Sequence, residues 1–155
     1  MPISLIPASL DLRQYFIKEM RFAVNENFDR AKFASQDYTY PELSCSVIEH
    51  NSEGNPREWQ FELRVESPEL GHGVDLPYSI AVVLSGQFVV EDGYAEEQVS
   101  VLARTNGPSV LYSAAREIIL NTTARTGFPP TKLPTVRFVP SPDSSEPVEE
   151  LGVGE

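Results

Sequence analysis

The stretch NGPSVLYSAAREIILNTTARTGFPP, residues 106–130, determines much of the fold. Its first two residues can cap a helix, and Pro108 suits the first helical position because its missing N–H would have no partner there. Gly127 can end the helix in a left-handed conformation, and the two prolines that follow prevent it from resuming. The sequence therefore predicts a long helix over residues 108–126.

The apolar residues of this helix cover one broad side, because they form two adjacent rows at a spacing of four: Val110, Leu111, Ala114, Ala115, Ile118 and Ile119. A helix that packs on one sheet needs only one apolar stripe. Two interpretations explain the extra breadth. The helix lies between its own sheet and a second subunit, or it is a well-buried helix of a monomer, and the periodicity favours neither.

Four segments read as strands, and residues 58–66 (EWQFELRVE) alternate most cleanly between apolar and polar side chains. Residues 10–24 place an apolar row from Leu10 to Val24 on one parity, with Phe16 and Met20 in the row. The other two strands are expected over 43–47 and 77–91, and a short helix capped by Asp92 over 94–104. Strands that follow one another without helices indicate an antiparallel meander. The predicted fold is α+β, a four-stranded antiparallel sheet with the long helix on one face.

Length and composition limit the architecture and the function. The 155 residues suffice for one domain, expected over 10–139, with an N-terminal extension over 1–9. Asp and Glu number 23 against 12 Lys and Arg, which disfavours binding of nucleic acid. Residues 140–155 carry acids and few apolar residues, so we expect a disordered acidic tail.

Cys45 is the only cysteine, which excludes an internal disulfide and favours a reducing compartment. The sequence shows neither a signal peptide nor an apolar run of ~18 residues, so we expect a cytoplasmic protein that does not insert into membranes.

Read in order, the segments resemble the SecB family of bacterial protein-export chaperones. The resemblance covers roughly residues 12–138 and rests on five segments: YFIKEMRF (15–22), PELSCSV (41–47), ELRV (62–65), YSIAVVLSGQF (78–88) and GPSVLYSAAREIILNTTARTGFPPTKLPTVRF (107–138). It implies an ATP-independent chaperone for unfolded polypeptides. It also implies a homotetramer, a dimer of dimers with the long helices between the layers, so that the six residues of the apolar rows form the oligomer interface.

Three departures from the family pattern bear on the partner. YSA (112–114) lacks the family's proline, and the residues after 138 lack the family's C-terminal helix. On the face that docks the motor ATPase SecA, Glu19 matches one family acid, while Ala23 and Ala81 stand where other acids would be. SecA and an antitoxin both remain candidate partners. The alternative function is accordingly a SecB-like adaptor, or a toxin–antitoxin-associated chaperone, that binds one specific partner segment.

Residues with catalytic or metal-binding chemistry are scattered. Cys45 alternates with apolar neighbours, as a buried small residue does. His50 and His72 lie in turn-like segments without a ligand partner at metal spacing. The sequence therefore predicts a protein that is not an enzyme and needs no cofactor or metal.

The connection over residues 25–42 is rich in aromatic residues and long for a structureless loop. Its rings either cover one end of the sheet or line a groove for extended polypeptide. The residues expected to line that client groove are Phe28, Phe33, Tyr38, Tyr40, Leu43, Val47 and Tyr78.

Overall fold

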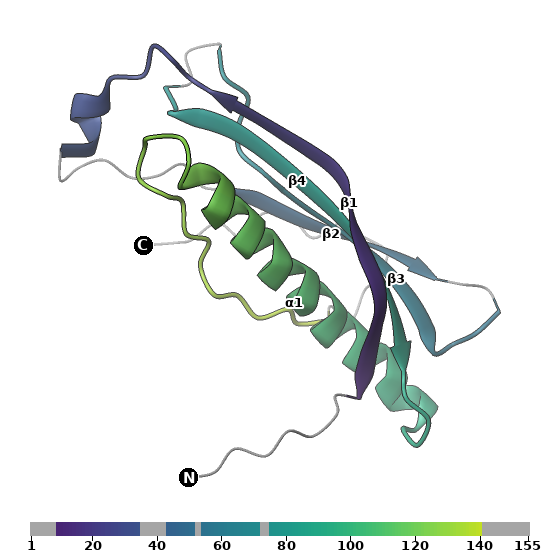
Figure 1. Cartoon of the computed structure of the whole chain (residues 1–155). Coiled ribbons are helices and arrows are strands. Elements are labelled where there is room, and N and C mark those ends of the chain that lie inside the picture. The colour runs from purple at the N-terminus through teal and green to yellow at the C-terminus, as the bar shows by residue number, and fades with distance from the viewer. Residues whose placement is uncertain (1–8, 35–42, 52–53, 72–74, 141–155) are drawn as a thin grey trace, which may run out of the picture.

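The structure is a computed structural model that describes residues 9–34, 43–51, 54–71 and 75–140. Its elements are β1 (Leu10–Val24), the 3-10 helix η1 (Arg30–Ala34), β2 (Ser44–Asn51), β3 (Glu58–Glu66), β4 (Tyr78–Val90) and α1 (Glu96–Thr123). The four strands form one antiparallel sheet, and α1 lies along one face of it (Figure 1). The predicted α+β class and the helix on one face of the sheet are confirmed.

The strand order differs from that of a simple meander. The order is β1-β4-β3-β2, so β2, β3 and β4 form a meander, but β1 pairs with β4 on the far side. Read backwards from β4, this is a Greek-key order. The connection between Val24 and Ser44 makes this order possible, because it is long enough to join strands at opposite edges of the sheet.

Strand β1 contains two irregularities that the sequence did not reveal. Its register against β4 shifts between Leu12 and Gln14 and again between Ile17 and Glu19. Each shift turns the following side chains to the other face, as a bulge does. The expected single apolar row is therefore wrong at Phe16, which lies opposite Ser85 on the face away from α1, while its neighbours Tyr15 and Ile17 face the helix side.

The core lies between the sheet and α1. Alternate residues of β3 and β4 bury their side chains against the helix, among them Phe61, Leu63, Val82, Leu84 and Phe88. Two glycines allow close approach. A Cβ at Gly107 of α1 would lie 2.6 Å from the Phe61 ring, and one at Gly86 of β4 would lie 2.8 Å from Leu111 Cδ2. Gly86 pairs regularly with both Tyr15 and Phe61, so the close approach leaves the strand pairing intact.

Helix α1 is one continuous helix, not the predicted pair. It begins after Ala95, which makes no side-chain capping bond, so Asp92 is not its cap; Asp92 instead pairs with Arg57 at 3.6 Å. Pro108 lies buried inside the helix. An interior proline costs roughly 3 kcal/mol, and packing of both halves on the same sheet offsets this cost. Locally, the Ser109 hydroxyl donates to the Thr105 carbonyl at 2.6 Å.

After α1, the chain turns at Gly127, whose φ of 77° confirms the predicted left-handed conformation. Residues 128–139, which we call the strap, then run back along the side of α1 away from β1 (Figure 1). The Thr131 N–H donates to Thr123 Oγ1 at 2.9 Å, and the Tyr112 hydroxyl donates to the Pro134 carbonyl at 3.0 Å. Since Leu133 is buried as well, the strap is part of the domain's packing.

Candidate functional site

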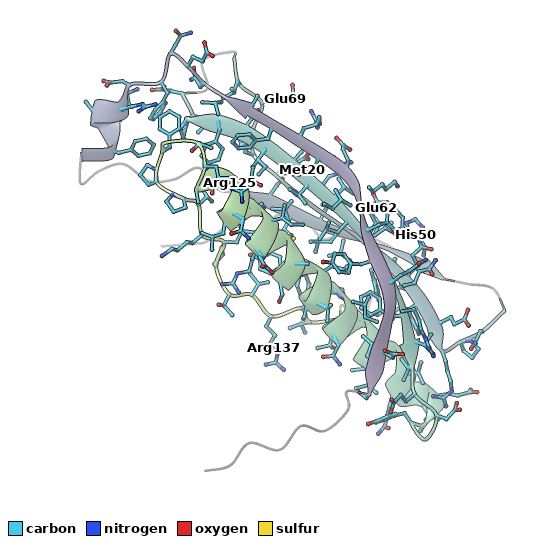
Figure 2. All side chains as sticks on the ribbon, viewed as in Figure 1. Met20, His50, Glu62, Glu69, Arg125 and Arg137 are labelled. Atoms are coloured by element: carbon cyan, nitrogen blue, oxygen red, sulfur yellow. The ribbon has the colours of Figure 1, made fainter. Side chains whose placement is uncertain are left out.

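An apolar surface lies where β1 faces α1, and we call it the β1–α1 surface. This surface contains a groove of about 430 Å³, which is lined by Tyr15, Met20, Ala114, Glu117, Ile118, Asn121 and Thr122. Large apolar side chains on it are 40–48% exposed, namely Tyr15, Ile17, Met20, Val24 and Val110. Figure 2 shows Met20 on this side of the sheet, whereas Glu62 and His50 lie on the opposite face. Sequence reasoning did not single out Tyr15 and Ile17, because the bulges hide their alternation.

The six residues expected at an oligomer interface divide into two rows. Leu111, Ala115 and Ile119 are fully buried in the chain's own core. Val110 is exposed, and Ala114 and Ile118 are half-buried at the groove. The second row is therefore the part of α1 that remains available to another chain, and the interface itself stays a prediction.

The aromatic connection begins as a packed cluster. The rings of Phe28, Phe33 and Phe128 lie 5.2 to 5.7 Å apart, and the Arg30 guanidinium stands 5.1 Å over Phe128. Phe28 is only 5% exposed. Phe28 therefore helps to cover the end of the sheet and helix, whereas Phe33 packs on it from outside and is only partly buried.

The remaining groove residues are placed differently from one another. Tyr78 is 2% exposed and packs against Phe22 with the ring centroids 5.6 Å apart, so it lies in the core of the chain. Tyr38 and Tyr40 lie outside the described residues. Leu43 and Val47, at the β2 edge of the sheet, are partly buried and pack against the core.

Around β2, a second apolar strip borders the strap, and we call it the β2–strap strip. Leu43 and Val47 on one side, and Val136 and Phe138 on the other, are apolar residues that remain partly accessible. One end of β2 is fixed by Glu49, which accepts two hydrogen bonds from Arg104 at 2.7 and 3.1 Å. This bidentate pair holds α1 against the edge strand.

Cys45 lies in β2 opposite Val65. The residue is exposed, so the predicted buried position is wrong, because β2 is an edge strand of the sheet. Its neighbours still desolvate the sulfur, and this raises the pKa of the thiol from 9.0 to about 11. A thiol with so high a pKa is protonated at neutral pH.

The face of the sheet away from α1 is covered by ion pairs over small buried residues. Lys18, an extra residue of the second β1 bulge, pairs with Glu62 of β3. Glu19 accepts from Arg21 at 2.7 Å and from Arg64 at 3.3 Å. The hydrogen bond from Arg21, together with the charges of both guanidinium groups, lowers the pKa of the Glu19 carboxyl. Glu19 is thus ionised but already neutralised by two cations.

Two other predictions on chemistry concern histidine and metals. His50 lies in β2 opposite Gln60 and not in a turn, because β2 extends four residues beyond the predicted strand, while His72 falls outside the described residues. No group of three His, Cys, Asp or Glu residues suited to a metal ion occurs in the part of the chain that the structure describes. None of its described helices is long and apolar enough to span a bilayer.

Comparison with known proteins places the fold among export chaperones. The sequence model of the family described as "Preprotein translocase subunit SecB" matches residues 6–140. The protein-export protein SecB of Xanthobacter autotrophicus is 25% identical over 130 residues, covering 84% of this chain and 80% of the relative. The protein of the same name from a Bradyrhizobium species is 25% identical over 138 residues, covering 89% and 82%.

A solved structure supports the same fold. It is the Mycobacterium tuberculosis Rv1957 SecB-like chaperone in complex with a ChAD peptide from the Rv1956 HigA1 antitoxin. The TM-score is 0.60 at 19% identity, and the match covers 83% of this chain and 91% of that one.

Proposed function

Because this chain belongs to the SecB family, we propose that it is an ATP-independent chaperone that holds unfolded or extended polypeptides. One structural observation carries the proposal: apolar side chains stay accessible on both sides of α1, on the β1–α1 surface and on the β2–strap strip. Contiguous accessible apolar area of this kind is typical of surfaces that bind other polypeptides. The proposal assigns no catalytic residue and no cofactor, and it places the protein in the cytoplasm.

The client path in this proposal follows the β2–strap strip. Leu43 and Val47 would contact the client directly, together with Phe33, Tyr38 and Tyr40 of the preceding connection. Phe28 and Tyr78 would support that path from beneath, because both are buried. Affinity would come from many small apolar contacts, which tolerate clients of varied sequence. The net charge of −11 favours basic clients.

The β1–α1 surface is proposed as the contact between subunits of a homotetramer. It combines half-exposed large side chains of β1 with Val110, Ala114 and Ile118 of α1. The small side chain of Ala114 would let a second helix approach closely.

The proposal has two candidates for the partner protein that receives the client. Protein export with SecA as partner follows from the family, and Glu19 is the candidate contact. A second candidate, an adaptor for one antitoxin-like segment, is favoured by the pairing of Glu19 with Arg21 and Arg64, which leaves little free negative charge there. The Rv1957 relative is bound to an antitoxin peptide.

Promiscuity tests the chaperone proposal and separates it from the adaptor. Several unrelated proteins, unfolded in denaturant, would be diluted into the purified chain without ATP, and aggregation would be followed by light scattering. We expect suppression for most of them at about stoichiometric ratios. Suppression limited to a single protein would favour the adaptor, and no suppression at all would refute the chaperone.

A further inference from the structure

The basic side chains that form no ion pair in the described part of the chain are concentrated near its C-terminal end. All twelve Lys and Arg residues lie among the described residues, and seven of them form ion pairs there: Arg13, Lys18, Arg21, Lys32, Arg57, Arg64 and Arg104. An eighth, Arg30, stands over the Phe128 ring. The other four are Arg116, Arg125, Lys132 and Arg137. None of these four side chains has an ion pair within the described part of the chain.

The four unpaired cations lie in the C-terminal half of α1, in the turn that follows it and in the strap, and we call them the basic strip. The strap lies against α1 through the Thr131–Thr123 and Tyr112–Pro134 hydrogen bonds, and Arg116 follows Tyr112 by one helical turn. Figure 2 shows Arg125 by the end of α1 and Arg137 on the strap. Arg125, Lys132 and Arg137 are exposed. The single acid in residues 105–140, Glu117, lines the groove toward β1.

The acids that would complement this strip follow it directly in the sequence. Residues 141–155 carry Asp143, Glu146, Glu149, Glu150 and Glu155 and no Lys or Arg. We propose that this acidic segment docks back onto the basic strip of its own chain, through charge alone, and so competes with acidic polypeptide for the strip. Such docking needs no packed structure, because the segment offers little apolar area to bury.

The geometry allows this return. Phe138 packs on Tyr112 with the ring centroids 5.9 Å apart, so the described part of the chain ends two residues beyond a contact with Tyr112. From there to Arg125 the helix rises by about 20 Å, at ~1.5 Å per residue. Fifteen residues reach up to about 50 Å when extended. The segment is therefore long enough for its acids to reach every cation of the basic strip.

Tethering strengthens a weak contact. A segment joined to its site by a short linker acts at an effective concentration on the order of millimolar. If the free peptide binds the strip with a Kd of about 0.1 mM, the tethered segment occupies the strip roughly nine-tenths of the time. A free acidic peptide should then bind the full chain about tenfold more weakly than a chain that ends at Pro140.

The test uses a fluorescent synthetic peptide of residues 141–155, with anisotropy measured at low salt. We expect binding to the chain ending at Pro140, about tenfold weaker binding to the full chain, and loss of both at high salt. In the shortened chain, the variant R125Q/K132Q/R137Q should bind at least tenfold more weakly. The matched control R13Q/R21Q/K32Q removes three cations that are already paired, and its binding should stay within about twofold.

Equal affinity of the full and shortened chains would overturn the proposal, and so would equal losses in the two triple variants. A second measurement needs no substitution. Amide NMR shifts between the full and shortened chains should fall on residues 116–137. An absence of shifts there would also refute the docking. The chaperone assay is read separately from both results, because it follows the aggregation of unfolded proteins and not the binding of the acidic peptide.

Discussion

The β1–α1 surface should hold the assembly together, and the triple variant Tyr15→Ser, Ile17→Ser, Met20→Ser tests this. Each of the three side chains is 42–48% exposed in the single chain. Full burial of a large apolar side chain contributes roughly 1.5–3 kcal/mol, so covering the exposed half contributes about 0.7–1.5 kcal/mol. Three such residues contribute about 2–4.5 kcal/mol per subunit. A two-fold contact uses each residue twice, which gives about 4–9 kcal/mol.

At about 1.4 kcal/mol per factor of ten, this loss weakens association by roughly 10³- to 10⁶-fold. We expect wild-type chain to behave as a tetramer by light scattering or sedimentation at micromolar concentration, and the triple variant as monomer. The monomer should keep its circular dichroism spectrum, since these side chains are half in water already. Ala115 would be a poorer probe, because it is fully buried against its own sheet and a charge there would unfold the chain.

A matched control lies on the other face of the sheet. Phe16 and Ile48 are each 51% exposed, but they point away from α1. The variant Phe16→Ser, Ile48→Ser removes similar exposed apolar area and should leave the tetramer intact. A triple variant with wild-type mass would refute the interface, as would dissociation of the control or a wild-type chain that is monomeric.

Three further predictions concern the client path, the core and the thiol. Leu43→Ser with Val47→Ser should weaken suppression of aggregation several-fold while the mass of the assembly stays unchanged; unchanged suppression would place the client path elsewhere. Gly107→Ala should lower the thermal midpoint by a few degrees, because overpacking against Phe61 costs roughly 1–3 kcal/mol, and a midpoint at or above that of the wild type would contradict the close approach. Iodoacetamide should alkylate Cys45 about a hundredfold more slowly at pH 8 in the folded than in the unfolded chain, because a pKa raised from 9.0 to about 11 lowers the thiolate fraction about a hundredfold. The rate in the folded chain should still rise up to about pH 11. Equal rates in the folded and unfolded chains would refute the desolvation.

The sheet was largely predictable from the sequence. Residues 58–66 and 10–24 were predicted with the observed bounds, and 77–91 differs from β4 by one residue at each end. These segments alternate apolar and polar side chains strongly, and local pattern is enough for that. Their order in the sheet was not predictable from adjacency alone, because pairing of β1 with β4 depends on where the long connection leads.

The errors arose where tertiary packing overrides a local signal. Pro108 looks like a helix start, but the residues on both sides of it pack on the same sheet, and the helix continues through it. The two β1 bulges are marked in the sequence only by Gln14 and Lys18 interrupting the apolar row, which is too weak a signal to locate a register shift. The sequence predicted that Phe28 and Tyr78 line the client groove, whereas the structure buries both rings.

Three sides of α1 have different surroundings, and this arrangement bears on function. One side faces the sheet, where Leu111 and Ile119 are fully buried, and a second side is covered by the strap. The third side, toward β1, stays half-exposed because β1 is an edge strand. Permanent subunit contacts are larger and more apolar than transient ones. The β1–α1 surface, with several half-exposed large side chains, suits the proposed permanent subunit contact, and the partly buried residues of the β2–strap strip suit the proposed path for clients that must later be released.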